Sequence, residues 1–213
     1  FVVNALAGDL GKSFVFSIPS IELILQRMPA TLELALCAVT LSVILGIPLG
    51  MYAGYRPESR TAKTIMATSI AGFSLPTFWV GLMLIMIFAV ELGWLPSTGR
   101  GQLGQFLGIR SSLFTLDGLS HLVLPALNLA LFNISLVIRL TRAGMRENMP
   151  MDYVKFARAK GLSQNRVVFV HVMKNIMIPV VTVIGLEIGQ VIAFAVVTET
   201  IFAWPGMGKL IID

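Results

Sequence analysis

The stretch Leu34–Tyr55, LALCAVTLSVILGIPLGMYAGY, decides the fold class, because it contains no Asp, Glu, Lys or Arg. A helix needs about 20 mostly apolar residues to cross the hydrocarbon core of a bilayer, and this stretch is long enough. Three further segments share this character, with Glu187 as their only acidic or basic residue: Thr64–Val90, Gly118–Ile138 and Asn175–Thr198. Strands of a membrane barrel are about half as long and alternate in polarity. The sequence therefore predicts an all-α, polytopic integral membrane protein, a helical bundle with four spans.

Composition supports the membrane class. The chain of 213 residues is 56% hydrophobic and 13% charged, whereas soluble domains carry about 45–50% apolar and about 25% charged residues. The net charge of +5 does not indicate nucleic-acid binding, because the charges avoid the spans and gather in the segments between them. The single cysteine, Cys37, excludes an internal disulfide and lies in an apolar run, where we expect it to pack as a small buried side chain.

Several spans carry residues that interrupt or tighten helices. Prolines occur within each of the four: Pro48, Pro76, Pro125 and Pro179. Such residues are tolerated where neighbouring helices satisfy the freed backbone groups, which favours a packed bundle. Glycines four residues apart, Gly46 with Gly50 and Gly185 with Gly189, are expected to allow close contact between helices.

The distribution of Lys and Arg predicts the orientation. Of sixteen such residues, three lie in 56–63 and eight in 139–174. Four spans place these two segments on the same side, which the positive-inside rule assigns to the cytoplasm. Both ends of the chain then lie outside, and we expect a further span before Phe1.

The segment from Glu147 to Pro179, ENMPMDYVKFARAKGLSQNRVVFVHVMKNIMIP, is too patterned for a plain connection. Asp152 suits a first helical turn, and Gly161 suits the end of that helix. One face of this helix is expected to hold the residues that follow each other at spacings of three, one and three: Tyr153, Phe156, Ala157 and Lys160. Ser163 is placed to cap a second helix that continues towards the next span. Two short helices meeting at Gly161–Ser163 fit either a basic surface resting on anionic lipid or a docking site for a cytoplasmic partner.

The chain resembles the permeases of binding-protein-dependent ABC transporters, in the dipeptide/oligopeptide branch. The resemblance rests on the loop segment DYVKFARAKGLSQNRVVFVHVMKNIMIPVVTVIGL and on blocks along the whole chain: GDLGKS, RMPATLELAL, GIPLGMYAGY, SLPTFWVGLMLIM, LGWLPSTG, HLVLPALNLAL, VIRLTRAGMRE and TETIFAWPGMGKLIID. That family has six spans, so the first would precede Phe1 and the last would follow Asp213. Residues 1–29 are then an external segment, residues 30–213 the transmembrane domain, and about 139–174 the cytoplasmic coupling loop.

The resemblance implies how this loop works. It is similar to the EAA motif of the family, with Gly161 at the motif glycine and Ala157 at a motif alanine, while Lys155 and Phe156 replace Glu and Ala. It implies docking on an ATPase subunit by residues around the turn: Tyr153, Lys155, Phe156, Ala157, Arg158, Lys160, Gly161 and Leu162. The chain itself is expected to bind no cofactor, since ATP and Mg would lie on the partner, and to hold no catalytic residue or metal.

The implied activity is ATP-driven import by alternating access in the bacterial plasma membrane. Expected partners are a second permease subunit, identical or homologous, two cytoplasmic ATPase subunits, an extracytoplasmic solute-binding protein and membrane lipid. Dipeptides and oligopeptides are the expected solutes, with glutathione, nickel or a sugar as alternatives. A passive channel remains a remote alternative. So does an intramembrane enzyme, although His121 and His171 are placed too far apart to form a site.

Polar residues within spans are candidates for the translocation path. Glu187 is the first, because a carboxylate inside a span usually faces an interior or a pathway. It is expected either to meet a cationic group of the solute or to form a hydrogen bond at a helix interface. Asn128 is the second candidate, although an interhelical hydrogen bond is the simpler interpretation.

The opening stretch Gly8–Ser13, GDLGKS, ends in the same three residues, GKS, as a nucleotide-binding P-loop motif. The motif requires a glycine five residues before Gly11, where this chain has Leu6. Its predicted external position also separates it from cytoplasmic ATP. We therefore expect no nucleotide site there.

Overall fold

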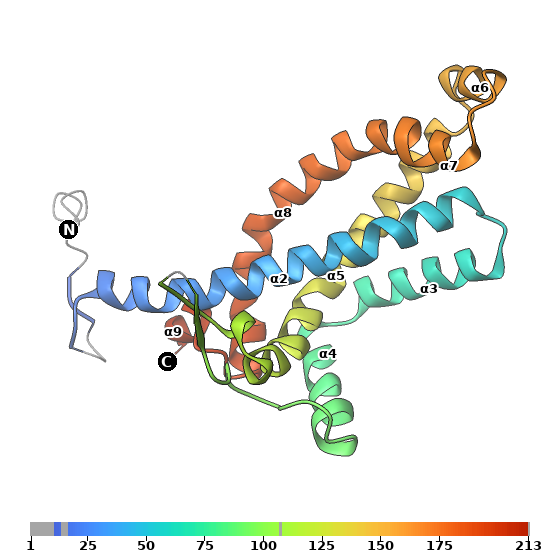
Figure 1. Cartoon of the computed structure of the whole chain (residues 1–213). Coiled ribbons are helices and arrows are strands. Elements are labelled where there is room, and N and C mark those ends of the chain that lie inside the picture. Colours follow the sequence, from blue (N-terminus) through green and yellow to red (C-terminus); the bar gives the residue numbers. More distant parts are fainter. Residues whose placement is uncertain (1–10, 14–16, 107, 213) are drawn as a thin grey trace.

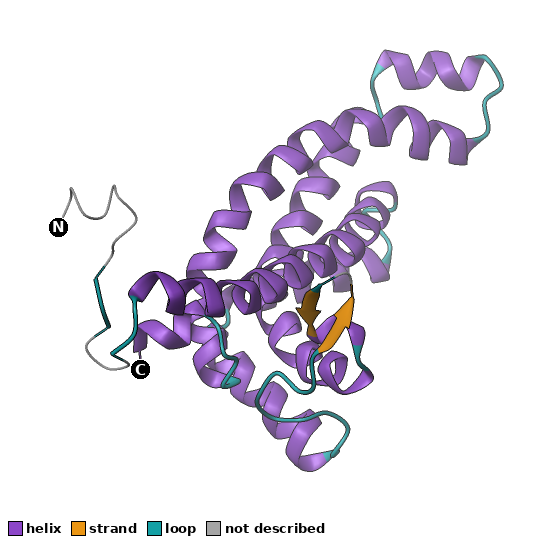
Figure 2. Ribbon diagram, turned by 60° about the vertical axis from the view of Figure 1, so that its left-hand side comes forward, coloured by secondary structure: helices purple, strands orange, loops and turns teal. Residues whose placement is uncertain are grey.

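The computed structural model describes residues 11–13, 17–106 and 108–212, so the first part of GDLGKS lies outside the described residues. Helices dominate: α2 (Ser20–Tyr55), α3 (Arg60–Ser74), α4 (Thr77–Leu84), the π-helix η1 (Ile85–Glu91), the 3-10 helix η2 (Ser112–Phe114), α5 (Leu116–Asn148), α6 (Asp152–Ala159), α7 (Gln164–Arg166), the π-helix η3 (Val167–Val172), α8 (Met173–Ile201) and α9 (Met207–Ile212). A small antiparallel hairpin, β1 (Gly104–Phe106) with β2 (Ile109–Ser111), completes the described part and is the orange element of Figure 2.

The elements divide between two ends of an elongated bundle (Figure 1). One end holds α6 and the turn between α2 and α3, and the other holds α9, the hairpin and the start of α5. Side chains from the end of α2 and from α7, including Tyr55 and Gln164, line one common groove. The two basic segments therefore lie at the same end of the molecule, as the charge distribution predicts, and this is the end expected to be cytoplasmic.

Within the described residues, three helices are long and apolar enough to cross a membrane: Ser20–Tyr55, Leu116–Asn148 and Gln164–Ile201, the last comprising α7, η3 and α8. They contain 36, 33 and 38 residues, which at about 1.5 Å per residue exceeds the roughly 30 Å hydrocarbon core. The predicted spans are the apolar parts of these helices. The helices continue past them, since residues such as Glu22, Gln26 and Arg27 are good helix formers as well as polar.

The segment predicted as one continuous span, Thr64–Val90, is instead broken. Its two halves, Arg60–Ser74 and Thr77–Glu91, are bent by 108° relative to each other. The cause is Pro76, which has no N–H to donate and disfavours helical backbone at the residue before it. Leu75 accordingly adopts an extended conformation, with ψ of 137°. The described chain has a fourth membrane-spanning unit only if this bent pair is counted as one.

Glycines bring α2 and α5 into close contact. A Cβ added at Gly46 would lie 2.7 Å from Val137 Cβ, and one at Gly50 would lie 2.7 Å from the carbonyl oxygen of Ile138. Gly54 is crowded in the same way by Met145. The prediction of glycine-mediated packing is thus confirmed for Gly46 and Gly50, and the stripe extends one turn further.

The other predicted pair behaves differently. No atom of the described residues lies within 4 Å of a Cβ built at Gly185 or Gly189. The prediction that these glycines pack against another helix is therefore wrong within this chain. The spacing alone could not distinguish a face that meets a neighbouring helix from a face that is open.

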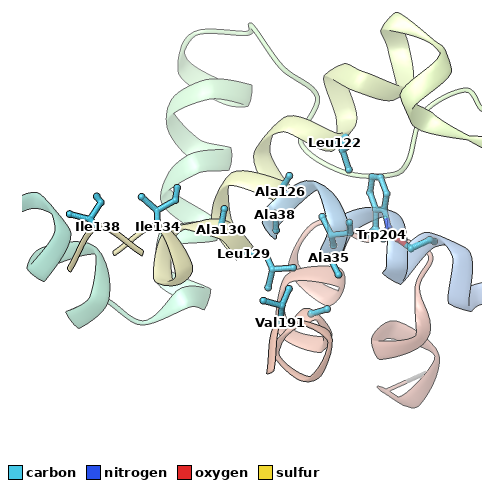
Figure 3. Close-up of a cluster of buried hydrophobic side chains, with 13 residues drawn as sticks. Ala35, Ala38, Leu122, Ala126, Leu129, Ala130, Ile134, Ile138, Val191 and Trp204 are labelled. Carbon is cyan, nitrogen blue, oxygen red and sulfur yellow. Dashed lines mark hydrogen bonds between the residues drawn. The ribbon is translucent and has the colours of Figure 1, made fainter. Parts of the chain in front are cut away.

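The buried core joins α2, α5 and α8 near the outer end (Figure 3). Ala35 and Ala38 of α2 pack with Leu129 and Ala130 of α5, and Val191 of α8 closes the cluster. Small alanines permit this close approach in the same way as the glycines do. The packing leaves α5 as the central helix, with 67% of its most apolar window buried, whereas the corresponding value for α7–α8 is only 17%.

Candidate functional site

Most of the predicted cytoplasmic loop, 139–174, belongs to the long helices. Arg139, Arg142 and Arg146 lie on α5, and residues from Gln164 onward continue helically into α8. Both ends of the predicted coupling loop are therefore helical, and their charged residues continue the apolar helices. The guanidinium of Arg139 lies 4.5 Å from the centre of the Phe73 ring, so this residue is held inside the bundle between α3 and α5.

The segment between these helices carries α6, which has two distinct faces. Val154 is fully buried and Ala157 is 6% exposed, and both pack in one cluster with Val167 and Val172 of η3. The hydroxyl of Tyr153 donates a hydrogen bond of 2.9 Å to Asn148 Oδ1 at the end of α5. The inner face of α6 is thus fixed to the helix before it and to the helix after it.

The outer face of α6 and the residue after the helix carry the exposed part of the predicted docking site. We call this part the docking surface and define it as Lys155, Phe156, Arg158 and Lys160. All four are exposed, and Phe156 is 62% exposed. The ammonium of Lys160 lies 4.6 Å from the centre of the Phe156 ring, a cation–π contact. Lys155 forms an exposed ion pair of 2.9 Å with Asp152. An apolar anchor surrounded by cations is therefore presented to the solvent.

Gly161 makes the turn that ends α6. Its φ is +77°, a left-handed conformation in which residues with a side chain are strained and glycine is not. The Leu162 N–H donates to Ala157 O at 3.3 Å, closing the turn, and Leu162 packs on the same inner cluster. Ser163 stands at the N-cap of the next helix, as predicted, but its side chain makes no capping hydrogen bond to a described residue.

The eight predicted docking residues therefore fall into two groups. Four form the exposed docking surface, while Tyr153, Ala157 and Leu162 hold α6 in place and Gly161 forms the turn. The sequence pattern placed Tyr153, Phe156, Ala157 and Lys160 on one face. In the structure, Phe156 and Lys160 face outward while Ala157 faces inward, so that grouping was wrong. An eight-residue helix is too short for periodicity to fix which face is buried.

The two candidates for the translocation path occupy different positions. Glu187 is the middle residue of α8 and lines a cavity of about 130 Å³ between α5 and α8. Asn128 is only 1% exposed, and its Nδ2 donates a 3.0 Å hydrogen bond to Thr198 Oγ1. Thr198 lines the cavity. Asn128 is therefore connected to the cavity only through its hydrogen bond to Thr198.

Two carboxylates at the outer end are buried, which the sequence did not predict. Glu199 is fully buried and accepts hydrogen bonds from Thr31 Oγ1 at 2.6 Å and from the Gly208 N–H at 2.6 Å. Glu33, 8% exposed, is paired with Arg100 and accepts a hydrogen bond of 2.9 Å from the Ser112 N–H. Both lie next to the predicted spans rather than inside them, which is why a search for intramembrane charge passed over them.

These carboxylates belong to one outer network. The indole N–H of the fully buried Trp204 donates to Ala30 O at 2.9 Å, and the Arg100 guanidinium lies 5.7 Å from the Trp204 ring centre. The network attaches the end of α8 and the start of α9 to α2. The blocks LGWLPSTG and TETIFAWPGMGKLIID, quoted above for the resemblance, lie next to this network, and the second contributes Trp204 and Glu199 to it.

The fold has a counterpart among solved structures. The MetNI methionine ABC transporter, solved in inward-facing conformations, matches with a TM-score of 0.65 and 16% sequence identity, over 89% of this chain and 79% of that chain. A likeness at this identity concerns the fold alone. It shows that the helical bundle has the type I ABC importer permease fold.

The sequence comparisons identify the family. Residues 46–213 match the family described as binding-protein-dependent transport system inner membrane component. Relatives include the di/tripeptide transport system permease protein DppB of Pseudomonas aeruginosa, 43% identical, the dipeptide permease DppB of Escherichia coli K12, 39% identical, and the oligopeptide permease AppB of Bacillus subtilis, 41% identical. The first two align with 100% of this chain and 67% of their own length, and AppB with 99% and 65%. The chain therefore belongs to this family of inner-membrane permease subunits of ABC importers.

Proposed function

We propose that this permease imports dipeptides, oligopeptides or similar small solutes across the bacterial plasma membrane, driven by ATP hydrolysis in partner subunits. The solute class is supported by the names of its relatives, which are di/tripeptide, dipeptide and oligopeptide permeases. The coupling to ATP is supported above all by one observation, the α6 helix with one face packed and the other presenting Phe156 among cations. ATP and Mg are bound by the partner, and this chain contributes the docking surface.

The docking surface suits a groove on an ATPase subunit. A large aromatic side chain such as Phe156 is the kind of residue that contributes most of the energy at an interface when it fills a pocket. The surrounding Lys155, Arg158 and Lys160 add electrostatic complementarity, which steers encounter and fixes register. Gly161 and the inward-facing residues then keep α6 at a defined angle on the bundle.

The same contacts transmit movement to the spans. Tyr153 binds Asn148 of α5, and Val154 packs with Val167 of η3, which continues into α8. A displacement of α6 by closing ATPase subunits therefore acts on α5 and α8 together rather than on a loose connection. Relative motion of these helices opens the path alternately to each side, a rigid-body switching transition.

The remaining partners are assigned from the exposed faces. On α8, Leu186 is 73% exposed and Ile178 is 69% exposed. We propose that a second permease subunit, identical or homologous, covers part of this face, and lipid covers the rest. The solute-binding protein then docks at the outer end, beside α9 and the hairpin, and two ATPase subunits dock at the α6 end.

Replacing Phe156 with alanine tests the docking surface. In proteoliposomes containing the whole transporter and its binding protein, we expect Phe156→Ala to lower ATP-driven uptake of radiolabelled alanyl-alanine about tenfold or more, the usual size of losing an interface anchor. Phe169→Ala is the matched control, because Phe169 is 63% exposed, close to the 62% of Phe156, but lies on η3. This control should transport nearly as well as the wild type.

Two outcomes would contradict the proposal. Equal uptake by Phe156→Ala and Phe169→Ala would remove the docking role of α6. Absence of peptide uptake by the wild-type assembly, with uptake of glutathione, nickel or a sugar instead, would refute the proposed solute class and leave the coupling intact. Uptake that continues without ATP would indicate a passive channel.

A further inference from the structure

The cavity beside Glu187 combines polar and aromatic side chains that have no part in the ATPase docking proposed above. It lies between α5 and α8, is closed by the first residue of α4, and has a volume of about 130 Å³. Polar side chains on its wall include Asn133, Glu187, Gln190 and Thr198, and Phe132 and Phe194 supply aromatic surface. A second, very small cavity also borders both Asn133 and Glu187, which places these two side chains next to each other.

Thr198 accepts the hydrogen bond from Asn128, but the other polar side chains of this cavity lack partners within the described chain. Asn133 is 6% exposed, and its buried Oδ1 has no hydrogen-bond partner. Among the described residues, Glu187 forms no ion pair and no side-chain hydrogen bond, and Gln190 forms no side-chain hydrogen bond.

Arg139, the basic residue that follows Asn133 on α5, is held over the Phe73 ring instead. Asn133 is buried, Glu187 is half-buried, and Gln190 is exposed on the open side of α8. A buried amide oxygen without a donor is costly, and a carboxylate inside a span usually faces a pathway, so this set is suited to a ligand.

The chemistry of the set points to a cation with several hydrogen-bond donors. Glu187 offers a carboxylate, and Asn133 and Gln190 each offer an amide oxygen. A primary ammonium carries three N–H donors and no acceptor, so three such oxygens match it one for one. The faces of Phe132 and Phe194 attract cations further.

The size of the cavity limits what it can hold. Pockets that enclose a whole small ligand measure about 300–1,000 Å³, so about 130 Å³ accommodates only one end of a peptide. The rest of the solute would extend along the open side of α8, where Phe194 is 59% exposed.

We propose that this cavity is an amine subsite of the translocation path, in which Glu187, Asn133 and Gln190 bind the primary α-ammonium of the peptide. This rests on the proposed function and makes it more specific. The site selects solutes with a free amino terminus inside the membrane, independently of the selection made by the binding protein. It also gives the charge of Glu187 a role at the midpoint of α8, halfway across the span.

Direct binding without the binding protein tests the subsite. The permease–ATPase assembly in nanodiscs is titrated with alanyl-alanine and with N-acetyl-alanyl-alanine, followed by saturation-transfer NMR. We expect acetylation to weaken binding about tenfold or more, the effect of losing one charge-assisted contact. The variant Glu187→Gln should lose the preference for the free amine, and Glu187→Gln/Gln190→Glu, which returns a carboxylate to the same cavity, should restore it.

A matched control and the transport assay complete the test. Glu91→Gln removes an exposed carboxylate at the end of η1 and should retain the preference for the free amine. Equal binding of both peptides by the wild type, an unchanged preference in Glu187→Gln, or no recovery in the double variant would each overturn the subsite. These results are separate from failure of the proposed function, which would appear as no ATP-driven alanyl-alanine uptake by the wild type.

Discussion

Gly50→Leu is expected to prevent this permease from assembling its bundle. A Cβ at Gly50 would already lie 2.7 Å from Ile138 O and 2.7 Å from Thr141 Cβ, so a longer side chain has no space unless α2 and α5 separate. Overpacking of this kind costs about 1–3 kcal/mol for added methylenes, and here backbone as well as side chain must move, so we expect the upper end or more. Separation would also disrupt the alanine-rich core that α2 and α5 share.

The measurement is the yield and thermal unfolding midpoint of detergent-solubilised protein. Gly185→Leu is the matched control, since both glycines lie inside long helices and open space surrounds Gly185. We expect Gly50→Leu to give little folded protein while Gly185→Leu stays close to the wild type. Equal unfolding midpoints for the two variants would show that the α2–α5 contact does not hold the bundle together.

Removing the Glu199 carboxylate is the second change with a large expected effect. Glu199→Ala leaves the buried N–H of Gly208 and the Thr31 hydroxyl without their acceptor, and also weakens the contact of the Lys209 N–H at 3.2 Å. Each unsatisfied buried group costs about 1–3 kcal/mol, so we expect a loss of several kcal/mol at the outer end. Because α9 and Trp204 are attached to α2 through this network, the outer end should loosen before the α6 end.

Trp204 provides the reporter for this variant. It is fully buried, so its loss of packing exposes the indole to quencher. We expect Glu199→Ala to increase quenching by acrylamide and to lower the unfolding midpoint. Glu91→Ala, which changes an exposed carboxylate, should do neither. If Glu199→Ala shows the same quenching and the same midpoint as Glu91→Ala, the carboxylate does not anchor α9.

The fold class and the position of the two basic segments at one end could be predicted from the sequence, because they depend on long apolar runs and on where basic residues lie. These signals are averaged over twenty or more residues and do not depend on which helices pack against the segment. The helix break at Pro76 could not be predicted from the presence of a proline, because Pro48, Pro125 and Pro179 all remain inside continuous helices. Whether a proline bends a helix depends on the surrounding packing.

The site was predictable only in part, for a related reason. The turn at Gly161 follows from local chemistry, since left-handed backbone favours glycine. The division of α6 into packed and exposed faces depends on η3, and the outer network joins Thr31 of α2 to Glu199 of α8, far apart in the chain. Asn133, which shares its cavity with Glu187, gave no sequence signal beyond being polar in a span, as Asn128 also is.

The central claim is that the outer face of α6 docks on an ATPase subunit, and photo-crosslinking tests it most directly. Benzoylphenylalanine is placed at position 156 or at position 169 of the full-length permease in native membranes, and the products are identified by mass spectrometry. We predict a crosslink to an ATPase subunit from position 156 and none, or far less, from position 169. Crosslinking of position 156 only to lipid or to the permease itself, with no ATPase product, would contradict the account.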